Sequence, residues 1–385
     1  MSARAPSHAD VVVIGGGVIG LATAYSLARS GAGKVVLLDQ GPFGSGSTCK
    51  AAGGVRAQFS DETNIVMGDY GLDVFERFAT LFDQEIDLRQ NGYLFLLDDP
   101  ADVADFERSV ALQQSLGVDS RMIDAAEAQR LAPIISTEGV LAAAYGPRDG
   151  HCTPESVVLG YARAARRAGA TLIPSCRVRG AEVTDGTIRA VHTEAGRIET
   201  GTVVCCAGAW SRAVGEWFGV DLPVDPVRRQ IVTTEPIPGL DQTMPMTIDF
   251  STTFYFHEEG PGLLIGMSDP DETVGFKLNR GDEWLPGLVG AAEHRVPSLA
   301  DVGIVSGWAG LYEVTPDHNG LIGEATGVSR FLYATGFSGH GFLLGPAMGE
   351  VMSSLVRGEA PFVDVSAFDA RRFEHANLHR EKNIV

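Results

Sequence analysis

The chain has 385 residues, a formal net charge of −19 at pH 7 and a hydrophobic fraction of 44%. This length suffices for two domains, and the composition of an ordinary globular protein excludes a disordered or fibrous class. The acidic excess argues against nucleic acid or an anionic membrane surface as a partner.

The sequence predicts neither a membrane span nor a secretory signal. No apolar run approaches the roughly 20 residues that cross a bilayer, and residues 1–10 are polar and lack an apolar core. The cysteines are odd in number without CxxC spacing, which fits a reducing compartment, and no His, Cys and Asp cluster has the spacing of a metal site. We therefore expect a cytoplasmic protein without a bound metal.

The first elements form a strand, a helix and a second strand. Residues 11–14 are a β-branched run that ends in glycine, which is typical of a buried parallel strand. Residues 18–30 predict a helix whose many small side chains allow close packing on a sheet, and residues 35–38 predict the second strand. A strand–helix–strand unit within about 30 residues predicts a right-handed βαβ crossover.

The next segments add a glycine- and serine-rich loop and an insertion. Residues 41–54 show little periodicity, whereas residues 63–83 carry apolar side chains at helical spacing. Residues 86–146 combine a strand at 93–97 with acidic helices, so we interpret them as an insertion into the α/β unit.

The second half returns to the sheet and then changes pattern. Thr153 and Pro154 suit the N-cap and first position of a helix over 153–168. Short strands around Leu172, Ile188 and Val203 rejoin the sheet, and residues 223–308 read as antiparallel strands rich in glycine and proline. A glycine-rich turn then precedes a helix predicted over 346–356. These patterns predict two interleaved domains, the first from 1–85, 146–222 and 309–385 and the second from 86–145 and 223–308.

A GxGxxG fingerprint lies between the first strand and the first helix. Gly15 permits a tight turn, Gly17 lets the backbone approach a pyrophosphate, and Gly20 lets the helix lie against the strand. The helix N-terminus offers free N–H groups and partial positive charge to phosphates. Asp39 ends the second strand, where it can accept hydrogen bonds from ribose hydroxyls and would repel a 2′-phosphate. The fingerprint predicts a dinucleotide but does not separate FAD from NAD.

Four further segments resemble the D-amino-acid-oxidase and sarcosine-oxidase superfamily of FAD enzymes. They are GSTCKAAGGVR at 46–56, CAGAWS at 206–211, WAGLYEVTPD at 308–317 and GFSGHGF at 336–342. The resemblance is closest to the branch of sarcosine oxidase, dimethylglycine dehydrogenase and the proline dehydrogenase β-subunit. It implies a Rossmann-like FAD-binding domain interleaved with an antiparallel-sheet (α+β) substrate domain.

The resemblance also implies which residues hold the cofactor. In that family the first loop wraps the flavin, the segment around Val178 meets the adenine, and the last two segments line the isoalloxazine ring. With the fingerprint, it predicts these cofactor-binding residues: Gly15, Gly17, Val18, Ile19, Gly20, Asp39, Gln40, Ser47, Thr48, Lys50, Ala52, Gly53, Gly54, Val178, Ala207, Gly208, Trp210, Gly310, Gly336, Gly339, His340, Gly341 and Phe342. The glycine turn at 336–341 exposes N–H groups suited to the flavin edge that gains negative charge on reduction.

The chain departs from the family at several functional positions. Gly310 and Lys50 replace the cysteine and the histidine to which relatives attach FAD covalently, so we expect noncovalent FAD. Leu264 and Leu343 stand where monomeric sarcosine oxidase has lysines, which favours a dehydrogenase over an oxidase. Tyr312 replaces a carboxylate-binding arginine of the primary D-amino-acid branch, which makes that activity a poorer fit.

Four residues are the candidates for the substrate site. Arg56 matches a family arginine near the substrate, and its planar fork suits a carboxylate. Tyr255 and Tyr312 can bind a carboxylate or form a wall of the site, and His340 is either a neighbour of the flavin or a packed turn residue. The adjacent Arg228 and Arg229 at the start of a strand suggest structural ion pairs.

The favoured function is FAD-dependent oxidation of a secondary or N-methylated amino acid, such as sarcosine or proline, by hydride transfer to flavin N5. The imine product would hydrolyse in water. The alternatives are a D-amino-acid or 2-hydroxy-acid dehydrogenase of the same fold, and a non-catalytic flavoprotein subunit or assembly factor. The sequence leaves open whether oxygen, a quinone or a protein accepts the electrons, and whether the chain forms oligomers.

Overall fold

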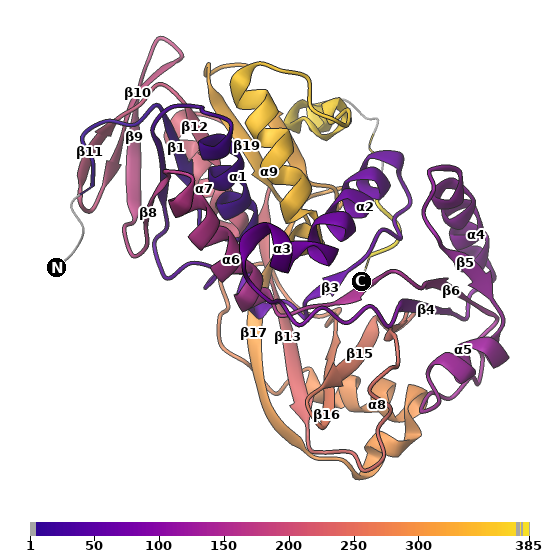
Figure 1. The fold of residues 1–385 in the computed structure, drawn as a ribbon. Coiled ribbons are helices and arrows are strands. Elements are labelled where there is room, and N and C mark those ends of the chain that lie inside the picture. The colour runs from indigo at the N-terminus through magenta and orange to yellow at the C-terminus, as the bar shows by residue number, and fades with distance from the viewer. Residues whose placement is uncertain (1–4, 375–377, 379, 385) are drawn as a thin grey trace.

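A six-stranded sheet of mostly parallel strands lies at the centre of the first half of the molecule. The computed structural model describes residues 5–374, 378 and 380–384 (Figure 1). The strand order is β18-β19-β12-β1-β2-β8, and only the β18–β19 pair is antiparallel. The bounds are Leu321–Glu324, Phe331–Thr335, Val203–Cys205, Val11–Ile14, Val35–Leu38 and Thr171–Ile173. Because β2 and β12 flank β1 on opposite sides, a crevice forms beyond the carboxyl end of β1.

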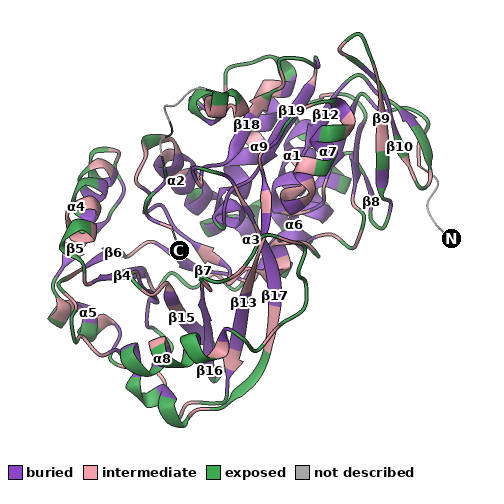
Figure 2. Cartoon of the chain, turned by 180° about the vertical axis from the view of Figure 1, so that it is seen from behind, coloured by how far each residue is buried: buried purple, intermediate pink, exposed green. Residues whose placement is uncertain are grey.

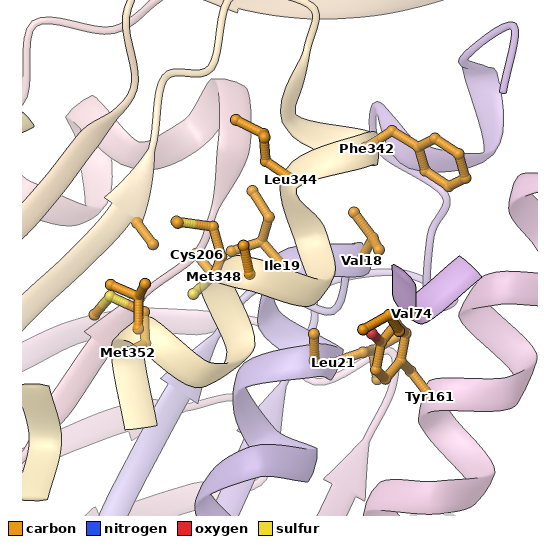
Figure 3. Packing of buried hydrophobic residues seen from close by; sticks show 14 of the residues in the cluster. Val18, Ile19, Leu21, Val74, Tyr161, Cys206, Phe342, Leu344, Met348 and Met352 are labelled. Carbon is orange, nitrogen blue, oxygen red and sulfur yellow. The ribbon is translucent and has the colours of Figure 1, made fainter. Parts of the chain in front are cut away.

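Helices α1 (Val18–Arg29), α6 (Pro154–Arg167) and α9 (Gly341–Arg357) pack on one face of this sheet. In Figure 3 Val18 and Ile19 of α1 lie beside α9, and a β-carbon at Gly345 of α9 would lie 2.6 Å from Val18 Cγ2. Their close approach depends on small residues, because a β-carbon at Gly349 would lie 2.9 Å from the backbone of Ala22. The sequence prediction of a tightly packing first helix is confirmed.

The opposite face is covered by a separate three-stranded sheet and by α7 (Ser211–Phe218). Strands β9 (Val178–Thr184), β10 (Thr187–Thr193) and β11 (Gly196–Glu199) pair antiparallel in the order β11-β10-β9. The strand predicted around Ile188 therefore exists, but it belongs to this small sheet and not to the central one. The alternation of apolar and polar residues along a strand does not reveal which sheet the strand joins.

An eight-stranded sheet forms the second half of the molecule, in the order β17-β13-β16-β15-β14-β4-β6-β5. Only β14 and β4 pair in parallel. The bounds are Ile304–Val314, Asp225–Thr234, Gly262–Met267, Phe254–Glu259, Met246–Asp249, Tyr93–Leu97, Ala142–Gly146 and Arg121–Ile123. The strand predicted at 93–97 is confirmed.

Helices α5 (Ala125–Leu131) and α8 (Leu285–Arg295) pack on one face of the eight-stranded sheet, and α8 turns an exposed side outward (Figure 2). Helix α4 (Pro100–Ser115) packs on part of the other face. The expected fold class is confirmed, since a parallel α/β unit is interleaved with a largely antiparallel sheet. The domain boundaries stay a prediction, and the one at 308/309 falls inside β17.

The remaining differences concern helix ends. The helix predicted at 63–83 is broken at Arg77 into α2 (Glu62–Glu76) and α3 (Phe78–Phe82). Helix α9 begins five residues before its predicted start and contains Pro346, and α8 was not predicted at all. Thr153 takes the N-cap position of α6 without a side-chain capping bond. None of the described helices is long and apolar enough to cross a membrane.

Candidate active site

A cavity of about 430 Å³ runs from the carboxyl ends of β1, β2, β12 and β19 to the inner face of the eight-stranded sheet. Residues from both sheets line it, so the interleaved topology creates the site. Nearly all of the predicted cofactor and substrate residues are among its lining residues. Only Gly20 and Gly336 are not.

The fingerprint glycines lie at the end of the cavity beside β1. Gly15 has φ +108°, and a β-carbon there would lie 2.1 Å from the carbonyl oxygen of Cys206. Gly17 is the N-cap of α1 and has no side chain, no acidic residue occupies the first turn, and Thr48 Oγ1 accepts a hydrogen bond from the N–H of Val18 at 3.1 Å. The partial positive charge of the helix therefore faces the cavity, as a diphosphate requires. Gly20 has the expected packing function, because its β-carbon would lie 1.9 Å from the carbonyl oxygen of Gly15.

Asp39 fixes the glycine turn and also lines the cavity. Its two carboxylate oxygens accept hydrogen bonds from the N–H groups of Gly16 (2.6 Å) and Gly41 (2.7 Å). Burial raises the pKa of this carboxyl group above its usual value. Gln40 and Val178 line the same region, where the sequence places the ribose and adenine.

The loop predicted to wrap the flavin lies along the middle of the cavity, with Ser47, Thr48, Lys50, Ala52, Gly53 and Gly54 in its lining. Strand β17 of the eight-stranded sheet holds this loop in place through hydrogen bonds. The Ser47 hydroxyl donates to the Leu311 carbonyl oxygen at 2.6 Å, and Trp308 Nε1 donates to the Lys50 carbonyl oxygen at 3.0 Å. Ala207, Gly208 and Trp210 line the wall that follows β12.

The N-terminus of α9 opens into the cavity from a second direction. Gly339, Gly341 and Phe342 line the cavity there, and no side chain caps the helix at His340. Both ring nitrogens of His340 are buried and lack a hydrogen-bond partner in the described part of the chain. Burial lowers its pKa to about 3, so the ring is neutral. Gly336 lies behind this turn with φ +71°, where its β-carbon would lie 2.6 Å from Thr315 Cγ2.

These features fit FAD. The N-terminus of α1 suits the diphosphate, and that of α9 suits the flavin edge that gains negative charge. The unpartnered ring nitrogens of His340 are polar atoms that a bound molecule can satisfy. The cavity also lies at the switch point of the parallel sheet, where such folds bind nucleotides.

Beyond the predicted flavin position, the cavity meets the eight-stranded sheet. Tyr93, Tyr255 and Tyr312 line this part together with the apolar Ile231, Met246 and Ile248. Tyr255 has its ring over Gly266, and Tyr312 has its ring over Gly339, since a β-carbon at either glycine would lie 2.3 Å from the tyrosine ring. Burial raises the pKa of both phenols, so they are neutral donors at physiological pH.

Arg56 lines the cavity, but its guanidinium group has protein partners. Nη1 donates to the carbonyl oxygen of Gln58, and Nη2 donates to that of Asn383 at 2.6 Å. The group also lies 4.2 Å from the centre of the Phe59 ring. Arg56 thus joins the loop after β3 (Gly54–Val55) to the C-terminal segment 380–384, whose Ile384 also lines the cavity.

The adjacent arginines of β13 have different surroundings. Arg228 Nε donates to Glu272 at 2.5 Å, which confirms the predicted ion pair for that residue. The same prediction is wrong for Arg229, which lines the cavity and has no carboxylate within 4.0 Å among the described residues. Alternation along the strand explains the difference, because neighbouring side chains point to opposite faces.

The sequence reading missed several lining residues. Arg229, Tyr93, Met246 and Ile248 lie at alternate positions of strands, and only the register of the sheet shows which face they share. Glu313 was also missed. It is a buried lining residue whose pKa burial raises to about 7, and its carboxylate accepts a 3.3 Å hydrogen bond from Ser47 Oγ.

One buried cluster resembles a metal site by composition. It consists of His151, His257 and Glu258. One ligand atom from each residue lies within 4.8 Å of the others, and the two imidazole rings are stacked with centres 4.0 Å apart and an angle of 24° between their planes. His151 Nε2 lies 3.0 Å from Glu258 Oε1, and the nitrogens of His257 lie within 2.9 Å of the carbonyl oxygens of Glu258 and Ala52. The cluster is a hydrogen-bonded support for the flavin loop.

The comparisons with known proteins agree with this geometry. The profile of the family described as FAD dependent oxidoreductase (DAO) matches residues 10–355, and the chain belongs to this family. It is a flavoprotein that uses FAD. Mitochondrial sarcosine dehydrogenase of Mus musculus is 33% identical over 96% of this chain and 42% of that protein. The chain thus spans less than half of that relative.

Two other matches cover most of both chains. FAD-dependent oxidoreductase domain-containing protein 1 of Xenopus laevis is 31% identical, over 99% of this chain and 85% of that protein. The crystal structure of L-proline dehydrogenase from P. horikoshii superposes with a TM-score of 0.91 at 32% identity, covering 97% of this chain and all of that one. The likeness therefore extends over both sheets and the cavity between them.

Proposed function

We propose that the protein oxidises a secondary or N-methylated amino acid to an imine that hydrolyses in water, with FAD as the primary electron acceptor. The observation that supports this most directly is the continuity of the cavity. It joins the nucleotide fingerprint to a chamber walled by three tyrosines and the guanidinium groups of Arg56 and Arg229. A small polar ligand with an apolar body suits such a chamber.

The names of the relatives support the substrate class. One relative is called a sarcosine dehydrogenase and one an L-proline dehydrogenase, and both of those amino acids are secondary amines. Their likeness covers the sheet that lines the chamber, which is where substrate selection would take place.

When bound, FAD supplies the hydride acceptor for the oxidation. The chain's own contribution is to orient the substrate and to exclude water. Ile231, Met246 and Ile248 form an apolar wall, and Leu278 lines the cavity from the loop after β16. The neutral His340 and the phenols offer uncharged polar contacts, which favours the neutral amine needed for oxidation.

The chamber also favours a dehydrogenase. Leu343, where related oxidases have a lysine, lines the cavity and is apolar. Charge that develops on oxygen during its reduction is better stabilised by a nearby cation. Lys50 is the lysine of the described residues that lines the cavity.

Anaerobic mixing of the holoprotein with a panel of compounds tests the proposal. Sarcosine, dimethylglycine or L-proline should bleach the oxidised flavin absorbance within the time of a turnover. Bleaching by D-alanine or lactate alone would favour the alternative dehydrogenases. If no compound of either group bleached the flavin, the cofactor would have a structural role.

A further inference from the structure

We propose that Arg229 is the anchor of the substrate carboxylate, while Arg56 positions the C-terminal segment. This inference rests on the proposed amino-acid substrate. It assigns recognition of the carboxylate to a residue of β13 in the eight-stranded sheet. This sheet lines the end of the cavity away from the nucleotide fingerprint.

The register of the sheet directs Arg229 into the chamber. Arg229 of β13 lies opposite Gly310 of β17, and Ile231 lies opposite Trp308. Directly opposed residues of an antiparallel pair share one face of the sheet. Gly310 and Ile231 both line the cavity, and so does Tyr312, two residues beyond Gly310 on the same face. The missing side chain of Gly310 leaves this part of the sheet open beside Arg229.

The hydrogen bonds of Arg229 leave one edge of its guanidinium group available. Nη1 donates to the carbonyl oxygen of Arg228 at 3.0 Å. Nε is buried without a partner, and no bond of Nη2 is found among the described residues. The Nε and Nη2 edge can therefore donate two parallel hydrogen bonds to one carboxylate. A half-buried cation without a counterion carries a desolvation cost, so its presence here suits an anionic ligand.

Tyr312 holds the guanidinium group in place. The Arg229 Cζ atom lies 5.1 Å from the centre of the Tyr312 ring, within the range of a cation–π contact. The planar guanidinium group stacks on aromatic rings, whereas lysine offers a point charge on a flexible stem. The contact therefore restricts the orientation of the free edge.

Arg56 is less suited to the same task. Both of its terminal nitrogens already donate to main-chain carbonyl oxygens, and aromatic rings of Phe59, Tyr93 and Phe95 lie around it. Binding a carboxylate through this fork would break the bond to Asn383. The geometry assigns Arg56 to positioning, because it ties the C-terminal segment to the loop after β3.

The test compares each amino acid with its decarboxylated analogue. L-proline is paired with pyrrolidine, and sarcosine with dimethylamine, in anaerobic flavin-reduction assays on the holoprotein. Arg229→Met should lower kcat/KM for the amino acids by about 30- to 1000-fold, mainly through KM, with little change for the amines. Arg229→Lys should recover only part of the preference, because lysine lacks the planar fork.

Two variants control for other effects. Arg228→Met removes the neighbouring charge from the opposite face of the strand, and it should keep the preference for amino acids over amines. Arg56→Met should raise the mobility of residues 380–384, measured by hydrogen exchange, and retain the preference. If Arg56→Met abolished the preference and Arg229→Met kept it, the assignment would be overturned.

Direct binding separates this inference from the proposed function. Acetate and benzoate are titrated into the oxidised holoprotein, and the flavin absorbance is followed. Weaker binding to Arg229→Met than to the unmodified protein and Arg228→Met would support the anchor even if no amino acid were oxidised. Equal binding to all three would refute it.

Discussion

Gly310 and Lys50 lie so close that a β-carbon on Gly310 would come 2.6 Å from Lys50 Cβ. These are the two positions at which the family resemblance places covalent attachment of FAD. A cysteine at residue 310 would therefore require Lys50 to move. The contact gives a steric reason for the absence of a side chain at residue 310.

We therefore predict that FAD is released completely on denaturation. Acid or heat should leave all of the yellow colour in the supernatant. Cys49 does not line the cavity, and burial raises the pKa of its thiol to about 11, so it is a poor candidate for attachment. Flavin fluorescence that migrated with the polypeptide on a denaturing gel would contradict this prediction.

Gly15→Ala should abolish FAD binding. The added methyl group would lie 2.1 Å from the Cys206 carbonyl oxygen, and the φ of +108° is unfavourable for alanine. Gly31→Ala is the matched control, because Gly31 also has positive φ but has no atom within 4 Å of an added β-carbon. It should cost about 1–2 kcal/mol of stability from the backbone alone and keep the flavin. Absorbance at the flavin band and thermal unfolding would measure both effects.

Reoxidation of the reduced flavin by oxygen should be slow. Stopped-flow mixing of substrate-reduced protein with air-saturated buffer should restore the oxidised spectrum more slowly than mixing with a quinone or dye. If oxygen reoxidised the flavin as fast as turnover, the protein would be an oxidase. Lys50→Met would then show whether the one lysine in the described lining provides the supporting charge.

The C-terminal segment 380–384 should be sensitive to pH. Burial, together with a hydrogen bond to Glu381, raises the pKa of Asp61 to about 8. Glu381 in turn accepts bonds from Ser60 N and Oγ at 3.0 and 2.8 Å. Because the folded pKa of Asp61 lies above its usual 3.8, its protonation stabilises the docked segment. This contribution is complete below about pH 4, decreases from there to pH 8 and is lost above it.

Hydrogen exchange in residues 380–384, corrected for its intrinsic pH dependence, should therefore increase as the pH rises from about 4 to 8 and level off above 8. Glu381→Gln replaces the carboxyl group that hydrogen-bonds to Asp61 with an amide, which can donate a hydrogen bond to Asp61 at any pH. Its exchange should vary much less between pH 6 and 9. An unmodified protein with flat exchange over this range would show that the pair does not control docking.

Local patterns explain what could be predicted from the sequence. The β-branched runs of β1 and β2 and the fingerprint between them depend only on neighbours, and their bounds agree with the structure. The start of α9 was predicted too late because glycines at 341 and 345 and Pro346 disguise a helix that packing stabilises. Arg229 was misread because two adjacent arginines have the same chemistry, and only strand pairing shows which one faces the cavity. Ile384 reaches the site through tertiary contacts that no local pattern encodes.

The parallel pairing of β4 with β14 and of β1 with β12 has a consequence for synthesis of the chain. A ribosome releases β1 and β4 long before their partners at residues 203–205 and 246–249, and β12 must then wait for β19 at 331–335. Such non-local pairing is slow, and strand edges left open meanwhile are prone to aggregation. The nucleotide site is complete only when α9 has been made. The yield of folded protein in a cell should therefore depend on protection of these early edges, and supplying FAD should help only after the last helix has emerged.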